Sequence, residues 1–178
     1  MNITMNNLTI RNATSYDAEL LCKWWNDGAV MAHAGFPNGI NTTADKIRNS
    51  LNTDTDDTHR RHIIEYNGNP IGEMNYRNKG EGIAEIGIKI CDFTQQEKGL
   101  GTTLLSMFID SLFNEYGYKK IILDTNTKNK RAQYVYEKKL GFNIVGIREQ
   151  AWRDQLGVMQ SAIDYALTNE EWNSRKYR

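Results

Sequence analysis

Two glycines stand in the segment Gln96-Glu-Lys-Gly99-Leu-Gly101, between an expected strand and an expected amphipathic helix. A glycine-containing turn at a helix start can point several unpaired backbone N–H groups at one anion, and the helix dipole favours negative charge there. A pyrophosphate fits this chemistry. The segment is neither a Walker loop nor a GxGxxG fingerprint. Because glycines at such turns also serve purely conformational needs, the segment alone leaves an anion site and a plain turn equally open.

A second segment with chemical potential follows the next expected strand. It reads Asn129-Lys-Arg-Ala-Gln-Tyr-Val-Tyr136 and leads to Leu140-Gly-Phe142. A phenol on this helix can donate a hydrogen bond or a proton to a leaving group on which negative charge develops. Most tyrosines on apolar helical faces only pack in the core, and Asn129 can be a plain N-cap, so a structural role stays open for both.

The remaining candidates are carboxylates, a thiol and histidines. Glu85 and Glu73 lie on neighbouring expected strands; each can act as a general base, and each can be an ordinary outward-facing strand carboxylate. Cys91 follows one of these strands, but no histidine lies nearby in the sequence, so a nucleophilic thiol is disfavoured. No metal is expected, because metal-ligand spacing is missing from the three histidines, His33, His59 and His62.

The composition excludes several functional classes. The chain has 178 residues with 22 basic and 22 acidic side chains, so no overall field draws it to nucleic acid or to an anionic membrane. No apolar run approaches the ~20 residues of a membrane span, and no signal sequence is recognisable. With only two cysteines, we expect a cytoplasmic protein with reduced thiols. The length is that of a single domain, residues 1–178.

Hydrophobic periodicity and turn signals predict the elements that position these residues. Strands are expected at Leu8–Arg11, His62–Tyr66, Ile71–Tyr76, Ile83–Ile90, Lys120–Asp124, Phe142–Trp152 and Met159–Leu167. Helices are expected from the Thr14–Asp17 cap to Gly28, from Thr42 to Leu51, at Gly101–Tyr116, at Lys130–Leu140 and from Thr168, before a frayed basic tail at Ser174–Arg178. The order predicts an α+β fold with an antiparallel meander and one crossover unit.

Together, the two segments resemble the GNAT superfamily of acetyl-CoA-dependent N-acetyltransferases. The match is Gln-x-x-Gly-x-Gly, about 27 residues of helix and strand, then Asn-x-x-Ala-x-x-x-Tyr and Leu-Gly-Phe. The region from Arg148 to Trp172 resembles the subgroup with ribosomal-protein, spermidine and some aminoglycoside N-acetyltransferases. The resemblance implies a three-layer, mixed α/β fold whose central sheet is mixed but mostly antiparallel and is flanked by helices.

The resemblance also implies how acetyl-CoA is bound. The coenzyme A pyrophosphate would lie on the glycine loop, formed by Gln96, Glu97, Lys98, Gly99, Leu100 and Gly101, with the Thr102 hydroxyl added at the helix start. Arg131 would face the phosphates together with Lys98 and Lys130, and Asn129 would contact the pantetheine arm. Strand amides near Cys91 and Asp92 would polarise the acetyl carbonyl. No metal takes part.

For catalysis, the resemblance implies that Tyr136 hydrogen-bonds or protonates the departing sulfur. Glu85 would act as the general base, with Glu73 as the alternative. Four residues, Glu137 to Leu140, separate Tyr136 from Gly-Phe, one more than is common in the family. We expect the helix end to absorb this extra residue without changing the direction of Tyr136.

The acceptor pocket would be bordered by Trp25, His33, Glu73 and Trp152. The predicted function is therefore direct transfer of an acetyl group from acetyl-CoA to a primary amine of a small molecule or a peptide N-terminus. A non-catalytic acyl-CoA sensor or binding module on the same fold is the alternative. Neither nucleic acid nor a membrane is an expected partner, and the identity of the acceptor and a homodimer stay open.

Overall fold

The computed structural model describes residues 1–176, which contain an eight-stranded sheet in the order β1-β2-β3-β4-β5-β6-β8-β7. All neighbouring strands are antiparallel except β5 and β6, which are parallel and joined by a helical crossover. The strands are β1 (Asn2–Met5), β2 (Leu8–Asn12), β3 (His59–Tyr66), β4 (Asn69–Asn78), β5 (Ile83–Ile90), β6 (Lys120–Asn126), β7 (Asn143–Arg153) and β8 (Met159–Thr168).

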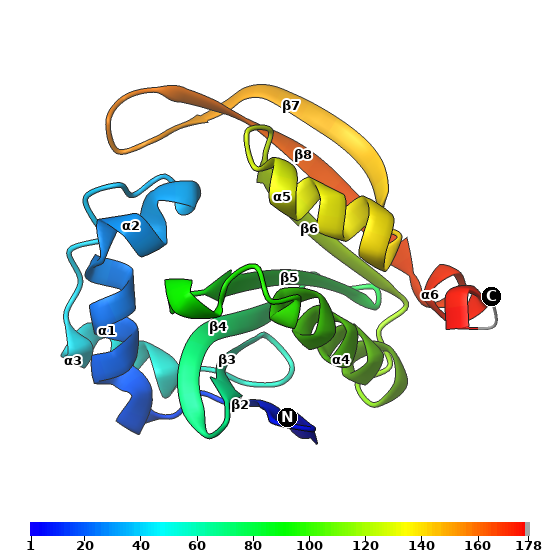
Figure 1. The fold of residues 1–178 in the computed structure, drawn as a ribbon, viewed down its shortest axis with the longest axis horizontal. Coiled ribbons are helices and arrows are strands. Elements are labelled where there is room, and N and C mark those ends of the chain that lie inside the picture. Colours follow the sequence, from blue (N-terminus) through cyan, green and yellow to red (C-terminus); the bar gives the residue numbers. More distant parts are fainter. Residues whose placement is uncertain (177–178) are drawn as a thin grey trace.

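The helices within these residues are α1 (Ala18–Asn26), α2 (Gly28–Met31), α3 (Ala44–Leu51), α4 (Leu100–Asn114), α5 (Lys130–Tyr134) and α6 (Asn169–Lys176). Figure 1 shows α1, α2 and α3 grouped at one side of the sheet, with the β7–β8 hairpin extending toward α2. The tail expected to fray from Ser174 is helical to Lys176; Tyr177 and Arg178 lie outside the described residues. None of the described helices is long and apolar enough to cross a membrane.

Two hydrophobic cores lie on opposite faces of the sheet. Ile63 and Ile64 are adjacent in β3 and both fully buried, and successive side chains of a strand point to opposite faces. Ile64 belongs to the larger core, which includes Phe108 of α4. Ile63 belongs to the smaller core with Leu21 of α1 and Ile47 of α3. Helices therefore cover both faces, as a three-layer fold requires, and the predicted fold class is confirmed.

Residues that favour turns and helix caps correctly predicted where several strands and helices begin or end. Asn67 and Gly68 have φ values of 51° and 74°, the left-handed pair that a two-residue hairpin turn requires. The Thr43 side chain accepts a hydrogen bond from the Lys46 amide and caps α3. The strand expected at Ile83–Ile90 is present with those bounds.

Two local features differ from the sequence expectations. The strand β1 was not predicted; it pairs with β2 along an exposed edge of the sheet, so it carries little hydrophobic signal. Gly28 does not end α1 but begins α2, because the Asp27 carboxylate accepts hydrogen bonds from the amides of Ala29 and Val30. A Cβ at Gly28 would lie 2.0 Å from the carbonyl oxygen of Pro37, so this close backbone approach explains the glycine.

The two parallel strands separate part-way along their length. Pairing between β5 and β6 covers only Ile83–Glu85 with Lys120–Ile122. Beyond this point β5 continues to Ile90 along β4, whereas β6 continues to Asn126 along β8. The sheet is therefore split between its two central strands, at the end where the connection to α4 begins.

Candidate active site

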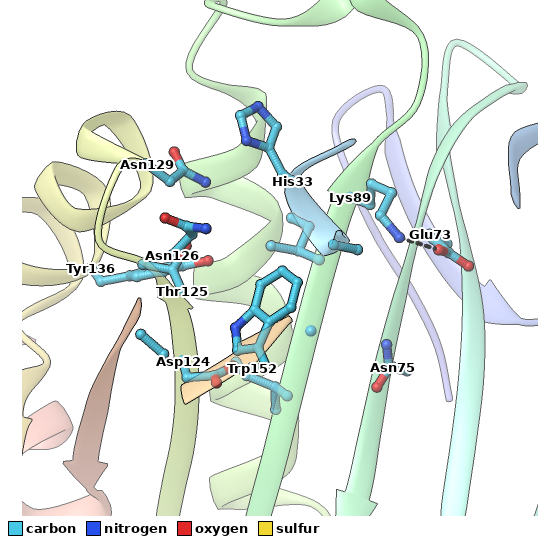
Figure 2. Close-up of a pocket in the computed structure, with 15 residues that line it drawn as sticks. His33, Glu73, Asn75, Lys89, Asp124, Thr125, Asn126, Asn129, Tyr136 and Trp152 are labelled. Atoms are coloured by element: carbon cyan, nitrogen blue, oxygen red, sulfur yellow. Dashed lines mark hydrogen bonds and ion pairs between the residues drawn. The ribbon is translucent and has the colours of Figure 1, made fainter. Parts of the chain in front are cut away.

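The split between β5 and β6 opens into a cavity of about 470 Å³. Figure 2 shows side chains from β4 and β5 on one side of it, side chains from β6 together with Asn129 and Tyr136 on the other, and Trp152 between them. The lining consists of His33, Ala34, Glu73, Asn75, Ile86, Gly87, Ile88, Lys89, Asp124, Thr125, Asn126, Asn129, Tyr136, Trp152 and Ala162.

The glycine loop connects β5 to α4 and has an unusual backbone conformation. Glu97 and Gly99 both have left-handed conformations, with φ values of 63° and 77°. Within residues 1–176, the N–H groups of residues 97–101 have no hydrogen-bond acceptor, and α4 starts at Leu100 and runs for 15 residues. Such a series of free amides at a helix start forms a concavity suited to an anion.

Gly101 leaves open space beside this loop. It lies in the first turn of α4 without a positive φ, and a Cβ added there would meet no atom within 4 Å. Glycine in a helix is less favourable than alanine by about 0.5–1 kcal/mol. Neither conformation nor packing within the protein requires it, so the free space above Gly101 fits the close approach of a phosphate group.

The side chains around the loop join it to the second motif. Gln96 donates to the Ile90 carbonyl at 3.0 Å and accepts from the Arg131 guanidinium at 3.3 Å, so its side chain braces the loop. Arg131 also lies 3.7 Å from the Glu97 carboxylate. The Lys98 ammonium donates to Gln95, and the Thr102 amide donates to the Gly99 carbonyl. Leu100 packs against the larger core and anchors the helix start.

Tyr136 lies on the far side of the split. Its ring packs edge-to-face against Phe142 and Tyr165, with centroids 6.1 and 5.6 Å away. Burial, and then the charge of Asp124, raise the pKa of Tyr136 to about 12, so the phenol is protonated at neutral pH. Asn129 caps α5 by accepting from the Ala132 amide and also lines the cavity.

The extra residue after Tyr136 is absorbed by a π-helical turn at Val135–Leu140. A π-turn closes with a hydrogen bond between residues five apart, so it holds one more residue than an α-turn. The turn ends at Gly141, whose amide donates to the Tyr136 carbonyl and whose φ is 77°. The expectation that the helix end absorbs the insertion is confirmed, and Tyr136 still faces the cavity.

On the β4 side, Glu73 is almost fully buried yet lines the cavity. Its carboxylate lies 3.1 Å from the Lys89 ammonium. The indole N–H of Trp25 lies 2.9 Å from each of the two carboxylate oxygens. His33 and Trp152 also line the cavity, as expected, whereas Trp25 does not and reaches the site only through its contact with Glu73.

Comparison with known proteins decides the family. Residues 7–143 match the family model of the acetyltransferase (GNAT) domain. The chain belongs to the GNAT acetyltransferase family. This GNAT acetyltransferase is 28% identical over 144 residues to aminoglycoside N(6')-acetyltransferase type 1 of Klebsiella pneumoniae, covering 74% of this chain and 72% of that protein. The predicted family and the predicted enzyme class, an acyltransferase, are confirmed.

Solved structures share the fold of this GNAT acetyltransferase over nearly its whole length. The spermidine N-acetyltransferase of Vibrio cholerae, in complex with CoA and spermine, has a TM-score of 0.83 at 23% identity, covering 94% of this chain and 98% of that chain. A ribosomal L7/L12 α-N-protein acetyltransferase in complex with coenzyme A has a TM-score of 0.84 at 15% identity, covering 96% and 99%.

Glu85 lies outside the cavity of this GNAT acetyltransferase, contrary to its expected place. It belongs to the last residue pair of β5 and β6 before the strands separate, and its carboxylate is 3.0 Å from the Lys79 ammonium. The split begins only at the next residue, Ile86, so Glu85 stays at the closed end of the sheet.

Cys91 also lies outside the cavity. Its thiol is buried and donates toward the Lys89 carbonyl, and burial raises the pKa of the thiol. The backbone amides of Cys91 and Asp92 both donate to the Ile71 carbonyl, at 2.8 and 2.9 Å. They are therefore not free to polarise an acetyl carbonyl, because the end of β5 turns toward β4.

Several lining residues were not singled out from the sequence. Asn75 and Lys89 lie on the same sheet face as Glu73, because alternate residues of a strand share a face and Lys89 is opposite Glu73 in the register. Asn126 belongs to the end of β6, beyond the strand boundary that was expected. The alternation of side chains along a strand could have identified Asn75 and Lys89 as lining residues. It could do so only once the point where β5 leaves β6 was known.

Proposed function

We propose that this chain transfers the acetyl group of acetyl-CoA directly to a primary amine of a small molecule or a peptide N-terminus. The proposal depends on one observation: three features lie around the same split in the sheet. Free amides lie at the start of α4, a protonated phenol from the π-helical turn after α5 lines the cavity, and a buried carboxylate from β4 lines the same cavity.

In this proposal the coenzyme is held mainly by backbone groups. The free N–H groups of residues 97–101 bind the pyrophosphate, assisted by the Thr102 hydroxyl and by the cationic side chains of Lys98 and Arg131. The separated edges of β5 and β6 carry unpaired backbone groups that can pair with the amides of the pantetheine arm. Asn129, at the start of α5, contacts the same arm.

The bound thioester supplies an electrophilic acyl carbon and a thiolate leaving group. As the amine nitrogen bonds to this carbon, the carbon–sulfur bond breaks and the Tyr136 hydroxyl gives its proton to the sulfur. An amine with a pKa near 10.4 is deprotonated only about once in 2,000 molecules at pH 7, so a base is useful. Glu73 takes the amine proton, directly or through a water molecule.

Glu73 is proposed as the base instead of Glu85 because only Glu73 lines the cavity. Free N–H groups of β5 beyond Glu85, where this strand has left β6, replace the amides of Cys91 and Asp92 as partners of the acetyl carbonyl. These donors belong to a strand that is held by β4 along its other edge, so they are fixed before the substrate binds.

Two measurements test the proposal. Acetyl-CoA at 100 times its dissociation constant should stabilise the protein by about 2.7 kcal/mol in thermal unfolding. Release of the free coenzyme thiol should then be followed with a panel of polyamines, aminoglycosides and peptides with free N-termini. We expect stabilisation and turnover with at least one amine class.

Gly99→Asp serves as the matched variant, because it places a carboxylate and a Cβ on the glycine loop without touching the cavity. It should weaken acetyl-CoA binding at least tenfold through crowding and like-charge repulsion. Unchanged affinity would place the phosphates elsewhere. Stabilisation by acetyl-CoA without turnover of any amine would instead identify a binding module.

A further inference from the structure

Trp25 was expected to border the acceptor, but its contacts give it a different position. It belongs to α1, and its indole N–H lies 2.9 Å from both oxygens of Glu73 in β4. Trp25 does not line the cavity, whereas Glu73 does. The indole N–H therefore contacts both oxygens of the carboxylate without lining the cavity itself.

The Trp25 ring is itself held by a buried ion pair. The Arg61 guanidinium carbon lies 6.0 Å from the centre of the ring, a distance at which a cation and an aromatic face attract. Arg61 is fixed by the Asp54 carboxylate at 2.6 Å and by the Ser50 hydroxyl at 2.8 Å. The indole N–H therefore has a defined direction before any ligand binds.

On the other side of Glu73, Lys89 lies opposite in the β4–β5 register and donates to one oxygen at 3.1 Å. A carboxylate offers about four lone-pair directions. Both oxygens accept from the same indole N–H, and one of them also accepts from the Lys89 ammonium. At least one lone-pair direction is therefore left for a further donor. An acceptor amine or a water molecule in the cavity can occupy that direction.

We propose that Trp25 is a positioning residue for acetyl transfer, which keeps the Glu73 carboxylate turned toward the acceptor amine. The inference rests on the proposed function, in which Glu73 is the base. A base must lie within hydrogen-bond reach of the proton it takes, and a displacement of about 1 Å can cost a hundredfold in rate. Without the indole N–H, Lys89 alone would hold the Glu73 carboxylate. The carboxylate could then rotate toward the ammonium.

The test compares Trp25→Phe, Glu73→Gln and the double variant. Trp25→Phe keeps an aromatic ring beside Arg61 and removes only the N–H donor. We expect its kcat to fall about tenfold, while the KM for the amine and the Kd for acetyl-CoA stay within twofold. Because both residues act through one carboxylate, the double variant should be no slower than Glu73→Gln alone.

Trp24→Phe is the matched control, since Trp24 is the adjacent residue of α1 and packs in the smaller core. Its kcat should equal that of the wild type, and thermal unfolding of both tryptophan variants monitors folding. If Trp25→Phe is unstable, Arg61→Lys tests the same link, because it keeps a cation beside Asp54 but removes the planar guanidinium from the ring; kcat should again fall while the Kd for acetyl-CoA is unchanged.

The outcomes separate this inference from the proposed function. A wild type that acetylates no amine ends the proposed function itself. If the wild type turns over but Glu73→Gln is equally active, acetyl transfer stands and the positioning role is overturned. The role is also overturned if Trp25→Phe keeps the wild-type kcat, or if the two single losses multiply in the double variant.

Discussion

Tyr136 shows how one side chain acquires a defined chemical state from its surroundings. Burial and the charge of Asp124 raise the pKa of the phenol to about 12, which keeps the proton in place at any ordinary assay pH. Phe142 and Tyr165 hold the ring from two sides. Among residues 1–176, no group hydrogen-bonds to the Tyr136 hydroxyl, so the donor is oriented and free for a partner in the cavity.

Replacing Tyr136 with Phe should lower kcat about 100-fold, the size expected for loss of a general acid. The Kd for acetyl-CoA should stay within twofold, because in the proposed arrangement the phosphates bind at the glycine loop, which does not line the cavity. Steady-state kinetics and calorimetric titration measure both quantities. Tyr165→Phe is the matched control, since the Tyr165 hydroxyl donates to Glu137 and does not line the cavity. An equal loss of kcat in both variants would contradict the role of Tyr136.

The start of α4 has an ordinary structural function, but the glycine at position 101 lowers the stability of the helix. The helix joins the two parallel strands and carries the fully buried side chains of Leu104, Phe108 and Leu112 into the larger core. Those contacts would form equally well with alanine at position 101, because a Cβ there meets no neighbour. The glycine therefore leaves open space at the helix start, where the proposed function puts a phosphate group.

Gly101→Ala should raise the free energy of unfolding by about 0.5 kcal/mol while weakening acetyl-CoA binding several-fold. Stability and affinity then change in opposite directions, a result that simple loss of structure does not produce. Asn114→Ala, on an exposed position at the other end of α4, serves as the control and should leave the Kd unchanged. Thermal unfolding and calorimetry give the two values. Unaltered affinity of Gly101→Ala would place the phosphates elsewhere.

At the scale of the whole molecule, a buried histidine contributes to the loss of stability in acid. His62 is fully buried between the sheet and α4, with ring centroids 5.8 Å from Tyr76 and 5.1 Å from Phe108. Neither ring nitrogen has a hydrogen-bond partner among the described residues. Burial lowers the pKa of His62 to about 3, so the folded protein keeps this ring neutral.

Because the folded pKa lies below the unfolded value near 6.5, His62 favours unfolding increasingly as the pH falls from about 6.5 toward 3. The loss is on the order of 4–5 kcal/mol over that range. His62→Leu should therefore flatten the dependence of unfolding free energy on pH between 6 and 4. Urea unfolding at several pH values measures this slope, and identical slopes in both proteins would show that the ring does not control acid stability.

The β7–β8 hairpin extends toward α2 (Figure 1), and its tip contacts the segment that follows α2. The Gln155 backbone donates to the Gly35 carbonyl, and its side chain bonds the Asn38 amide and the Gly39 carbonyl at 2.9 and 3.0 Å. The Trp152 ring packs so closely over Gly35 that a Cβ there would lie 2.2 Å from it.

Gln155→Ala should raise the KM for the amine several-fold and leave the Kd for acetyl-CoA unchanged, because it loosens only the acceptor side. Leu156→Ala is the control: Leu156 follows in the same turn, and its side chain is largely exposed. Amine titrations at saturating acetyl-CoA provide the comparison. A rise in KM for both variants would assign the effect to the turn as a whole.

Features that depend on a few neighbouring residues could be predicted from the sequence. The Asn67-Gly68 turn, the Thr43 cap and the glycine loop follow from backbone conformation and hydrogen bonds within four or five residues. The order of the two motifs was enough to indicate the family. Local signals failed where a partner distant in sequence decided the outcome, as at Cys91, whose backbone amide donates to the Ile71 carbonyl of the neighbouring strand.

The tertiary structure alone decided which carboxylate reaches the cavity. Glu73 and Glu85 lie on the same face of neighbouring strands, so alternation does not distinguish them. What separates them is the point where β5 leaves β6, fixed by pairing between segments more than thirty residues apart. The contact of Trp25 with Glu73 likewise joins residues 48 positions apart. Such contacts depend on how α1 packs against the sheet, and no local pattern in the sequence encodes that geometry.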